Sequence, residues 1–266
     1  MGLIPAPVIK LLWAPPVRRH LAGLPLLRRI YAGWTRRHPF DLRFGIDTSG
    51  SVPAEVCAPG MGKQISPYGG SQPSIIRGVL QSLPDLERYA FVDVGCGKGR
   101  PLIVASEFPF KRVRGVELSP ALAAIARDNA AAVAGRGVGS VPIEIEVGDA
   151  TAADPPADCV VYFLYHPFGR DLVHAFVTNV TRHLGGGLRH GFIVYYNPVH
   201  GAVMDESPVL TRWSADVWPY APDEIGFGPD LSDTVVVWQT LPARYAARTS
   251  AGRQIVVSGN KADLGN

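Results

Sequence analysis

The chain has 266 residues, of which 47% are apolar and 18% are charged. This length is enough to bury a large core, and this balance excludes a disordered or fibrous protein. The net charge of +3 conceals an asymmetry, because residues 1–44 carry eight basic side chains against one acidic one, a net +7. The remaining 222 residues carry 18 basic and 22 acidic side chains, a net −4.

Three cysteines lie far apart in the sequence, at Cys57, Cys96 and Cys159. Their spacing matches neither a zinc site nor a disulfide framework, so we expect reduced thiols and no metal site. No stretch approaches the roughly 18 consecutive apolar residues of a transmembrane helix. A lysine and two prolines interrupt the apolar N-terminus, which argues against a cleaved signal peptide. These features predict a cytoplasmic protein.

Residues 1–44 are predicted to form a basic, amphipathic N-terminal arm. Their six prolines exclude one continuous helix. A short helix is indicated by apolar residues at helical spacing, namely Leu27, Ile30, Tyr31 and Trp34. Such a helix could pack on the body, lie on an anionic membrane as a peripheral contact, or recognise a protein substrate. Nucleic-acid binding is the less favoured interpretation, because the rest of the chain is acidic and shows no known binding module.

Residues 45–89 are expected to form a cap or loop rich in Gly, Pro and Ser, ending in a lead-in helix over 74–82. From residue 90 strands and helices alternate, which predicts crossover units and a parallel sheet. Strands are predicted at 90–94, 112–118, 143–147, 159–165, 192–196, 209–213, 234–239 and 255–257. Helices are predicted at 101–107, 120–134 and 172–184. We expect the main domain to span 90–250 and a C-terminal tail to span 251–266.

The first strand of this domain runs into a glycine-rich turn. Glycines stand at 95, 97 and 99, and Asp93 lies two residues before the first of them. Glu117 ends the next strand, 22 positions after Gly95. In parallel sheets ligands bind beyond the carboxyl ends of the strands, and an acid at this place can accept hydrogen bonds from ribose hydroxyls. The pattern predicts a nucleoside cofactor.

Two cofactors compete for this arrangement. The dinucleotide motif needs its third glycine at residue 100, where this chain has Arg100. A pyrophosphate would also meet the charge of Asp93, whereas S-adenosylmethionine has no phosphate and carries cationic groups that favour a carboxylate. The spacing therefore favours S-adenosylmethionine over a nicotinamide cofactor. We expect Lys98 and Arg100 to be solvated, with contact between either of them and the carboxylate of the cofactor as the alternative.

The stretch resembles the class I S-adenosylmethionine-dependent methyltransferases, whose first motif is an acid followed by Gly-x-Gly-x-Gly. The resemblance continues through Glu117 and Asp149 to Tyr165-His166-Pro167-Phe168, over about residues 74–200. It implies a Rossmann-like, doubly wound α/β sheet of seven strands with the last strand antiparallel, preceded by the N-terminal helical arm. It implies S-adenosylmethionine as the cofactor, with Glu117 at the ribose and Asp149 at the adenine. The residues that it assigns to the cofactor are Asp93, Gly95, Gly97, Gly99, Glu117 and Asp149.

The motif from Gly95 to Arg100 is similar to that of bacterial members, and these are also similar to non-SET lysine methyltransferases. Amine-methylating relatives often place Asn or Asp before Pro at the end of the fourth strand, where this chain has His166. A neutral imidazole can act as a base towards a hydroxyl, so nitrogen and oxygen acceptors both stay open. The candidate catalytic residues are His166 and Asn197, the latter as a source of the missing amide.

Aromatic side chains at the ends of two strands are candidates for contacts with a cationic acceptor, namely Tyr165, Phe168 and Tyr196. Tyr68 and Ser74 are expected in a segment that folds over the cofactor. The predicted function is methyl transfer from S-adenosylmethionine to a protein lysine or a small molecule. The alternatives are a non-catalytic protein that binds the cofactor and acts through its basic arm, and a nicotinamide-dependent oxidoreductase.

Overall fold

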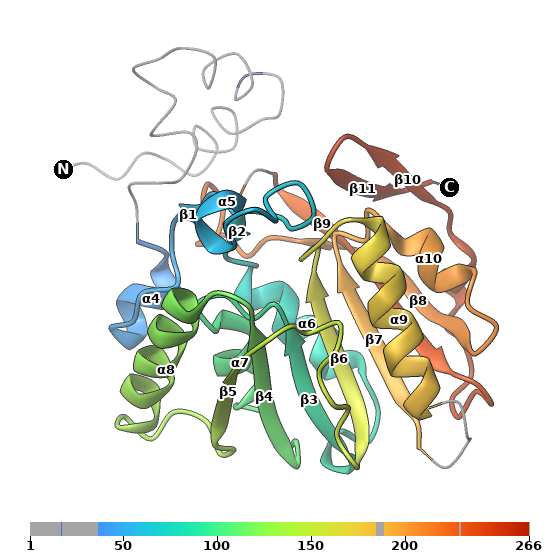
Figure 1. Ribbon diagram of the computed structural model, residues 1–266, viewed down its shortest axis with the longest axis horizontal. Helices are drawn as coiled ribbons and strands as arrows, with labels where there is room; N and C mark the ends of the chain where they lie inside the picture. Colours follow the sequence, from blue (N-terminus) through green and yellow to red (C-terminus); the bar gives the residue numbers. More distant parts are fainter. Residues whose placement is uncertain (1–16, 18–36, 185–188, 229, 266) are drawn as a thin grey trace.

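A seven-stranded sheet forms the centre of the computed structural model, which describes residues 17, 37–184, 189–228 and 230–265 (Figure 1). Its strand order is β5-β4-β3-β6-β7-β9-β8. The strands are β3 (Tyr89–Val94), β4 (Arg112–Glu117), β5 (Ile143–Val147), β6 (Cys159–Tyr165), β7 (Gly191–Tyr196), β8 (Leu210–Pro219) and β9 (Ser232–Thr240).

The direction of the strands defines the place of the site. β3 pairs in parallel with both β4 and β6, and the parallel arrangement extends to β5 on one side and β7 on the other. The chain therefore reverses its winding at β3, which is where α/β sheets bind ligands. β9 lies antiparallel between β7 and β8. The predicted seven-stranded sheet with an antiparallel strand at 234–239 is confirmed.

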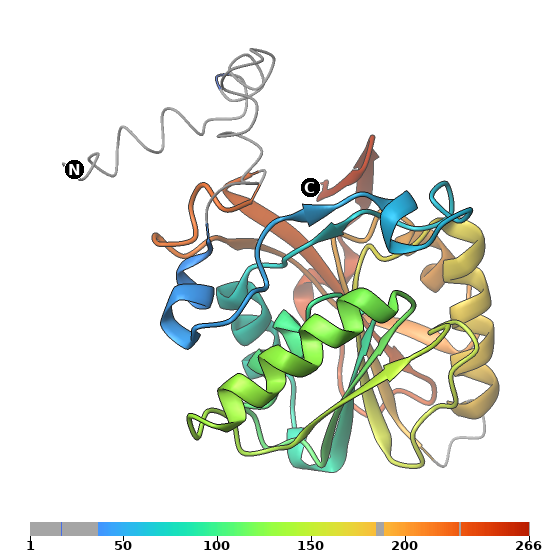
Figure 2. The same ribbon diagram turned by 60° about the vertical axis from the view of Figure 1, so that its left-hand side comes forward.

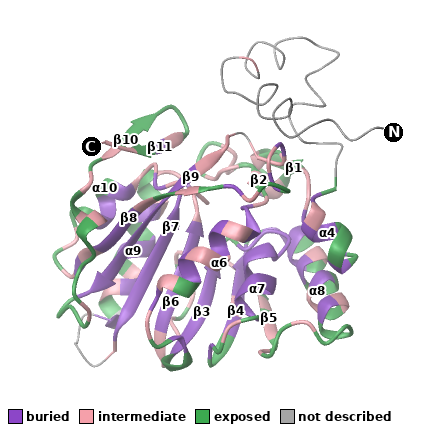
Figure 3. Ribbon diagram, turned by 180° about the vertical axis from the view of Figure 1, so that it is seen from behind, coloured by how far each residue is buried: buried purple, intermediate pink, exposed green. Residues whose placement is uncertain are grey.

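Helices cover both faces of the sheet, as Figures 1 and 3 show. The helices are α6 (Pro73–Ser82), α7 (Arg100–Ala105), α8 (Pro120–Ala134), α9 (Arg170–Leu184) and α10 (Gly201–Asp205), with 3-10 turns η1 (Leu86–Arg88) and η2 (Thr249–Gly252). Buried residues of α6, α7 and α8 join the core on one face, and those of α9 and α10 join the core on the other. Ser119 caps α8 by accepting a hydrogen bond from the Leu122 N–H, and Pro120 occupies the first turn, as predicted.

The central strand β6 shows why the sheet is apolar on both sides. Val161 and Phe163 belong to the core under α6 and α7, while Val160, Tyr162 and Leu164 belong to the core under α9. Successive side chains of a strand point to opposite faces, so a strand covered on both faces must be apolar throughout. The run from 159 to 165 was predicted as such a strand, and its fold confirms this.

Much of the segment before the sheet lies across the ends of its strands (Figures 1 and 2). It comprises α4 (Pro39–Phe44), β1 (Ser51–Val52), α5 (Ala54–Cys57) and β2 (Tyr68–Gly69), and β1 pairs with β2 antiparallel. Phe40, Phe44 and Ile46 are buried in the main core. The predicted boundary after residue 44 thus falls inside a packed stretch. The predicted helix over 27–34 lies outside the described residues.

The C-terminal residues form a hairpin of β10 (Ile255–Ser258) and β11 (Lys261–Leu264), outside the main sheet. Ala262 is fully buried, so the hairpin packs on the body. Within the described part of the chain, no helix has the length and apolar character that crossing a membrane requires. The same residues contain no group of three or more His, Cys, Asp or Glu side chains that could hold a metal ion.

Candidate active site

A cavity of about 410 Å³ opens at the carboxyl ends of β3, β4, β6 and β7. We call residues 48–71 the cap. Residues of the cap between Cys57 and Ser71 form one wall of the cavity. The predicted site residues that line the cavity are Asp93, Gly95, Gly97, Glu117, Asp149, Tyr165, His166, Phe168 and Asn197. Gly99 and Tyr196 are not among the lining residues.

The glycines of the turn after β3 have separate tasks. All three adopt positive φ, at +73° for Gly95, +53° for Gly97 and +84° for Gly99. A Cβ on Gly97 would lie 2.4 Å from the ring of Tyr68, and one on Gly99 would lie 3.2 Å from Cβ of Ala126. Gly97 therefore lets the cap approach the turn, whereas Gly99 lets α7 pack against α8.

Asp93 is a buried acid with an unused acceptor. Its side-chain Oδ2 has no hydrogen-bond partner among the described residues, although the residue is only 2% exposed. Burial raises the pKa of this carboxyl well above its ordinary value, and the nearby Glu117 adds to the effect. A buried, unpaired carboxyl oxygen is costly unless a donor reaches it. The cavity thus offers a place for a ligand's cationic N–H group.

Glu117 fixes the turn to the end of β4. The N–H groups of Gly97 and Ser119 donate to its two carboxylate oxygens, at 2.7 and 2.8 Å. Burial raises the pKa of Glu117, while these N–H donors act in the opposite direction. Each carboxylate oxygen has a second lone pair, so the side chain can still accept hydrogen bonds from ligand hydroxyls.

Asp149 is the exposed acid of the set, just beyond β5. Its Oδ1 accepts hydrogen bonds from the backbone N–H and the hydroxyl of Thr151, at 2.8 and 2.7 Å. The local turn therefore orients this carboxylate at the rim of the cavity.

The end of β6 brings an imidazole and two aromatic rings to the cavity. His166 has a φ of +39°, and its Nδ1 lies 3.5 Å from the hydroxyl of Tyr195. Burial, and to a smaller extent the neighbouring His200, lower the pKa of His166 to about 4. His166 is consequently a neutral imidazole at physiological pH. Phe168 pairs with Ile65 of the cap through an isolated β-bridge, which closes this side of the cavity.

Asn197 lines the cavity, but its amide is already committed. Its Nδ2 donates to the carbonyl of Asn260 at 2.9 Å, and its Oδ1 accepts from the N–H of Ala262 at 2.8 Å. Asn260 is itself a lining residue. Asn197 therefore holds the C-terminal hairpin against the cavity, a task different from the predicted supply of an amide to the acceptor.

Tyr196 points away from the cavity and is fully buried. Its hydroxyl donates to Asp233 at 2.6 Å, and the hydroxyl of Tyr220 donates to the same oxygen at 2.7 Å. The Tyr196 ring packs edge-on against Tyr165, with centroids 4.6 Å apart. The structure therefore gives Tyr196 a supporting position behind Tyr165, in place of the predicted contact with the acceptor.

Several residues of the site escaped the sequence prediction. Lys98 and Arg100, expected in solvent, are only 8% and 3% exposed and reach back to residues 47–49 and 71. Met61 and Ile65 of the cap also line the cavity. Tyr68 lines it as expected of the folded-over segment, whereas Ser74 lies elsewhere and hydrogen-bonds Glu224.

Residues 91–187 match a family model described as a methyltransferase domain. No curated protein matches the chain. Among solved structures, TrmN from Thermus thermophilus matches with a TM-score of 0.47 and 16% identity, over 65% of this chain and 50% of that one. An RNA methyltransferase from Salinibacter ruber in complex with S-adenosyl-L-homocysteine matches with a TM-score of 0.42 and 20% identity, over 67% and 97%. The mitomycin 7-O-methyltransferase MmcR matches with a TM-score of 0.47 and 15% identity, over 84% and 71%.

The matched residues begin in β3 and end just after α9, so they include the glycine-rich turn, Glu117, Asp149 and the end of β6. They also include the point at which the strand order reverses. The part of the chain that is similar to a methyltransferase domain is therefore the part that holds the glycine motif, Glu117 and Asp149.

Proposed function

We propose that the cavity binds S-adenosylmethionine and that the protein transfers its methyl group to a nitrogen or oxygen of a small-molecule or protein acceptor. The observation that carries the cofactor assignment is the Oδ2 of Asp93, a residue of the cavity wall, which is buried and has no hydrogen-bond partner among the described residues. Burial favours the protonated form of Asp93 in the free protein, and a cationic group of S-adenosylmethionine beside it would favour the carboxylate, whereas a pyrophosphate would disfavour it further. Asp93, Gly95, Gly97, Glu117 and Asp149 would hold the cofactor.

Gly99 would contribute indirectly, because it sets the start of α7 against α8 without lining the cavity. When bound, the cofactor would supply a methyl group on a sulfonium: an acceptor lone pair would attack the methyl carbon in line as the carbon–sulfur bond breaks, and S-adenosylhomocysteine would leave. The protein's own contribution is then mainly to hold the acceptor, and such positioning can be worth roughly 7–11 kcal/mol.

Another part of the cavity wall has the character of an acceptor site. It is formed by Tyr165, His166 and Phe168 at the end of β6, with Met61 and Ile65 of the cap. The side chains of this wall are apolar apart from the Tyr165 hydroxyl and the neutral imidazole of His166. We propose that His166 orients the acceptor or takes its proton, and that the Tyr165 and Phe168 rings face the acceptor. That the acceptor is not a nucleic acid stays a prediction.

Calorimetry with S-adenosylmethionine, S-adenosylhomocysteine and NAD tests the cofactor assignment. We expect the first two to bind and NAD to show no heat of binding, and binding of NAD alone would overturn the assignment. Radiolabelled methyl transfer into a cell lysate, separated into protein, RNA, lipid and small-molecule fractions, tests the acceptor. Label in the protein or small-molecule fraction is expected, and label confined to RNA would contradict the proposed acceptor class.

A further inference from the structure

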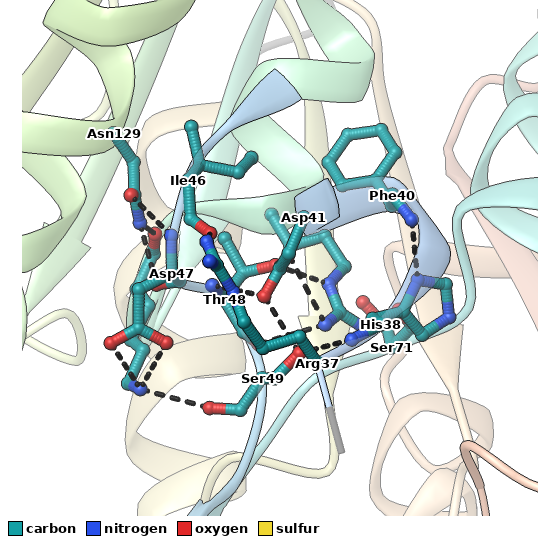
Figure 4. Close-up of polar contacts among 12 residues, drawn as sticks. Arg37, His38, Phe40, Asp41, Ile46, Asp47, Thr48, Ser49, Ser71 and Asn129 are labelled. Atoms are coloured by element: carbon teal, nitrogen blue, oxygen red, sulfur yellow. Dashed lines mark hydrogen bonds and ion pairs between the residues drawn. The ribbon is translucent and has the colours of Figure 1, made fainter. Parts of the chain in front are cut away.

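A buried polar cluster joins the start of the described chain to the glycine-rich turn, and Figure 4 shows Asp41, Thr48, Ser49 and Ser71 converging in it. We infer that Arg100, the first residue of α7, is a positioning residue that holds the cap over the cofactor cavity. This inference rests on the proposed binding of the cofactor in that cavity, and it adds a task for a residue that the glycine motif itself does not include.

Arg100 forms hydrogen bonds with both ends of the cap. Its Nη2 donates to the carbonyl of Thr48 at 2.8 Å, and its Nη1 donates to the carbonyl of Ser71 at 2.9 Å. Its Nε donates to the Thr48 hydroxyl at 2.7 Å. The planar guanidinium fixes the directions of these bonds, which a lysine ammonium could not reproduce. One side chain thus sets where the cap leaves the body and where it returns.

Asp41 completes the cluster from the opposite side. Its carboxylate is fully buried and lies 3.8 Å from Nη2 of Arg100. It accepts hydrogen bonds from the Thr48 N–H at 2.8 Å, from the Ser49 hydroxyl at 2.6 Å and from the Thr48 hydroxyl. The Thr48 hydroxyl therefore links the two charges, because it accepts from Arg100 and donates to Asp41. Such charge-assisted bonds are stronger than bonds between neutral groups.

The cluster reaches the cavity through Tyr68. The Tyr68 hydroxyl donates to the carbonyl of Thr48 at 2.7 Å, the same oxygen that Arg100 holds. The Tyr68 ring lies over Gly97 and lines the cavity. A Cβ on Gly70 would lie 2.5 Å from the Arg100 guanidinium, so the cap backbone approaches it closely. Because the same turn would hold the cofactor, the position of the cap and the shape of the cofactor cavity depend on each other.

A purely structural role would not require this chemistry. A buried ion pair contributes little net stability compared with well-packed apolar side chains, because both charges lose their hydration. The Arg100 guanidinium instead fixes the positions of the Thr48 and Ser71 carbonyls relative to Gly99, because its hydrogen bonds have fixed directions. We therefore expect the cluster to affect ligand affinity more than it affects the stability of the sheet.

The test compares Thr48→Val with Thr48→Ser in the full chain, by calorimetry with S-adenosylhomocysteine and by hydrogen exchange of residues 48–71. Valine keeps the shape of threonine but removes the hydroxyl, whereas serine keeps the hydroxyl. We expect Thr48→Val to weaken binding about ten-fold and to speed exchange in the cap of the free protein. Thr48→Ser should stay within about two-fold of the unmodified chain in affinity.

Arg100→Lys should also weaken S-adenosylhomocysteine binding and speed exchange in the cap, because lysine keeps the charge but lacks the planar guanidinium that binds both carbonyls. Arg77→Lys is its matched control, since Arg77 pairs with Glu107 at the surface and away from the cavity. Unchanged affinity and unchanged cap exchange in both Thr48→Val and Arg100→Lys would overturn the inference. So would faster exchange spread evenly over the sheet. If the unmodified chain bound no S-adenosylhomocysteine, the proposed function would fail, whereas the exchange data on the free protein would still decide whether Arg100 holds the cap.

Discussion

The two buried acids of the cavity differ in what they still lack. Asp93 keeps an oxygen without a partner in the described part of the chain, while both oxygens of Glu117 accept hydrogen bonds from backbone N–H groups of the turn and of the α8 cap. The first is therefore free for a ligand, and the second shapes the turn as well as facing the ligand.

Glu117→Ala should weaken S-adenosylhomocysteine binding by about ten-fold or more, because it removes the acceptor for two buried N–H groups. Glu117→Gln should lose less, since the amide oxygen can still accept one of them. Isothermal titration measures both. Glu144→Ala, an exposed position on β5, serves as the control. Equal affinity of Glu117→Ala and the unmodified chain would refute this.

His166→Ala should lower the turnover of the labelled acceptor fraction and leave S-adenosylhomocysteine affinity within about two-fold, because His166 is not among the residues proposed to hold the cofactor. The readouts are single-turnover methyl transfer and calorimetry. If turnover were unaffected, His166 would have no part in the reaction.

The pH dependence of turnover should reflect the low pKa of His166. Burial and His200 lower that pKa to about 4, below the ordinary 6.5, so the ring stays neutral through pH 6.5 and becomes charged only near pH 4. The rate should therefore show no inflection from His166 near pH 6.5 and should fall only below about pH 5. A rate profile from pH 4 to 8 checks this, and an inflection near 6.5 that disappears in His166→Ala would contradict it.

Among the elements, the glycine turn and the cap are matched in shape. Gly97→Ala should distort the cap, because the new Cβ would lie 2.4 Å from the Tyr68 ring and the residue would keep a φ of +53°. Gly60→Ala is the control, since Gly60 also has positive φ but has nothing within 4 Å of its Cβ position. Both should lose about 1–2 kcal/mol of unfolding free energy. Only Gly97→Ala should also lose S-adenosylhomocysteine affinity. An equal loss of affinity in both variants would disprove the match in shape between the turn and the cap.

The C-terminal hairpin lies in the stretch that was predicted to be a tail, residues 251–266. Its strand at 255–257 was predicted correctly, but its place beside the cavity depends on the Asn197 amide and on a strand pairing that only the folded chain creates. The same reason explains Tyr196. Its partner Asp233 comes from β9, far along the chain, so nothing local to 196 indicated that the ring turns away from the cavity.

Strand and helix positions could be predicted because they depend on local patterns of apolar residues, glycines and the Ser119–Pro120 cap. The burial of Arg100 and Lys98 could not, because their partners Asp41 and Asp47 lie more than 45 residues upstream and meet them only after the cap folds. The sequence therefore predicted the residues at the strand ends that line the cavity better than it predicted the cap.

For the whole molecule, the basic residues before Arg37 lead to a prediction about the N-terminal arm. Every lining residue of the described cavity lies at Cys57 or later. Removing residues 1–36 should therefore leave S-adenosylhomocysteine affinity unchanged, as calorimetry can check. If the arm contacts anionic membranes, the shortened chain should also lose cosedimentation with phosphatidylserine vesicles that the full chain shows. A loss of affinity on shortening would instead assign the arm a share in the cofactor site.

The grip of Arg100 on Thr48 and Ser71 also bears on how this protein could change over evolutionary time. Because the two ends of the cap are fixed beside the turn, the residues between them can vary in length and sequence at small cost, about 0.6 kcal/mol for each doubling of a flexible loop. Those residues include Met61 and Ile65, which face the proposed acceptor. Substitutions in the cap could thus change the acceptor during evolution, while the proposed cofactor residues at the ends of β3, β4 and β5 stay the same.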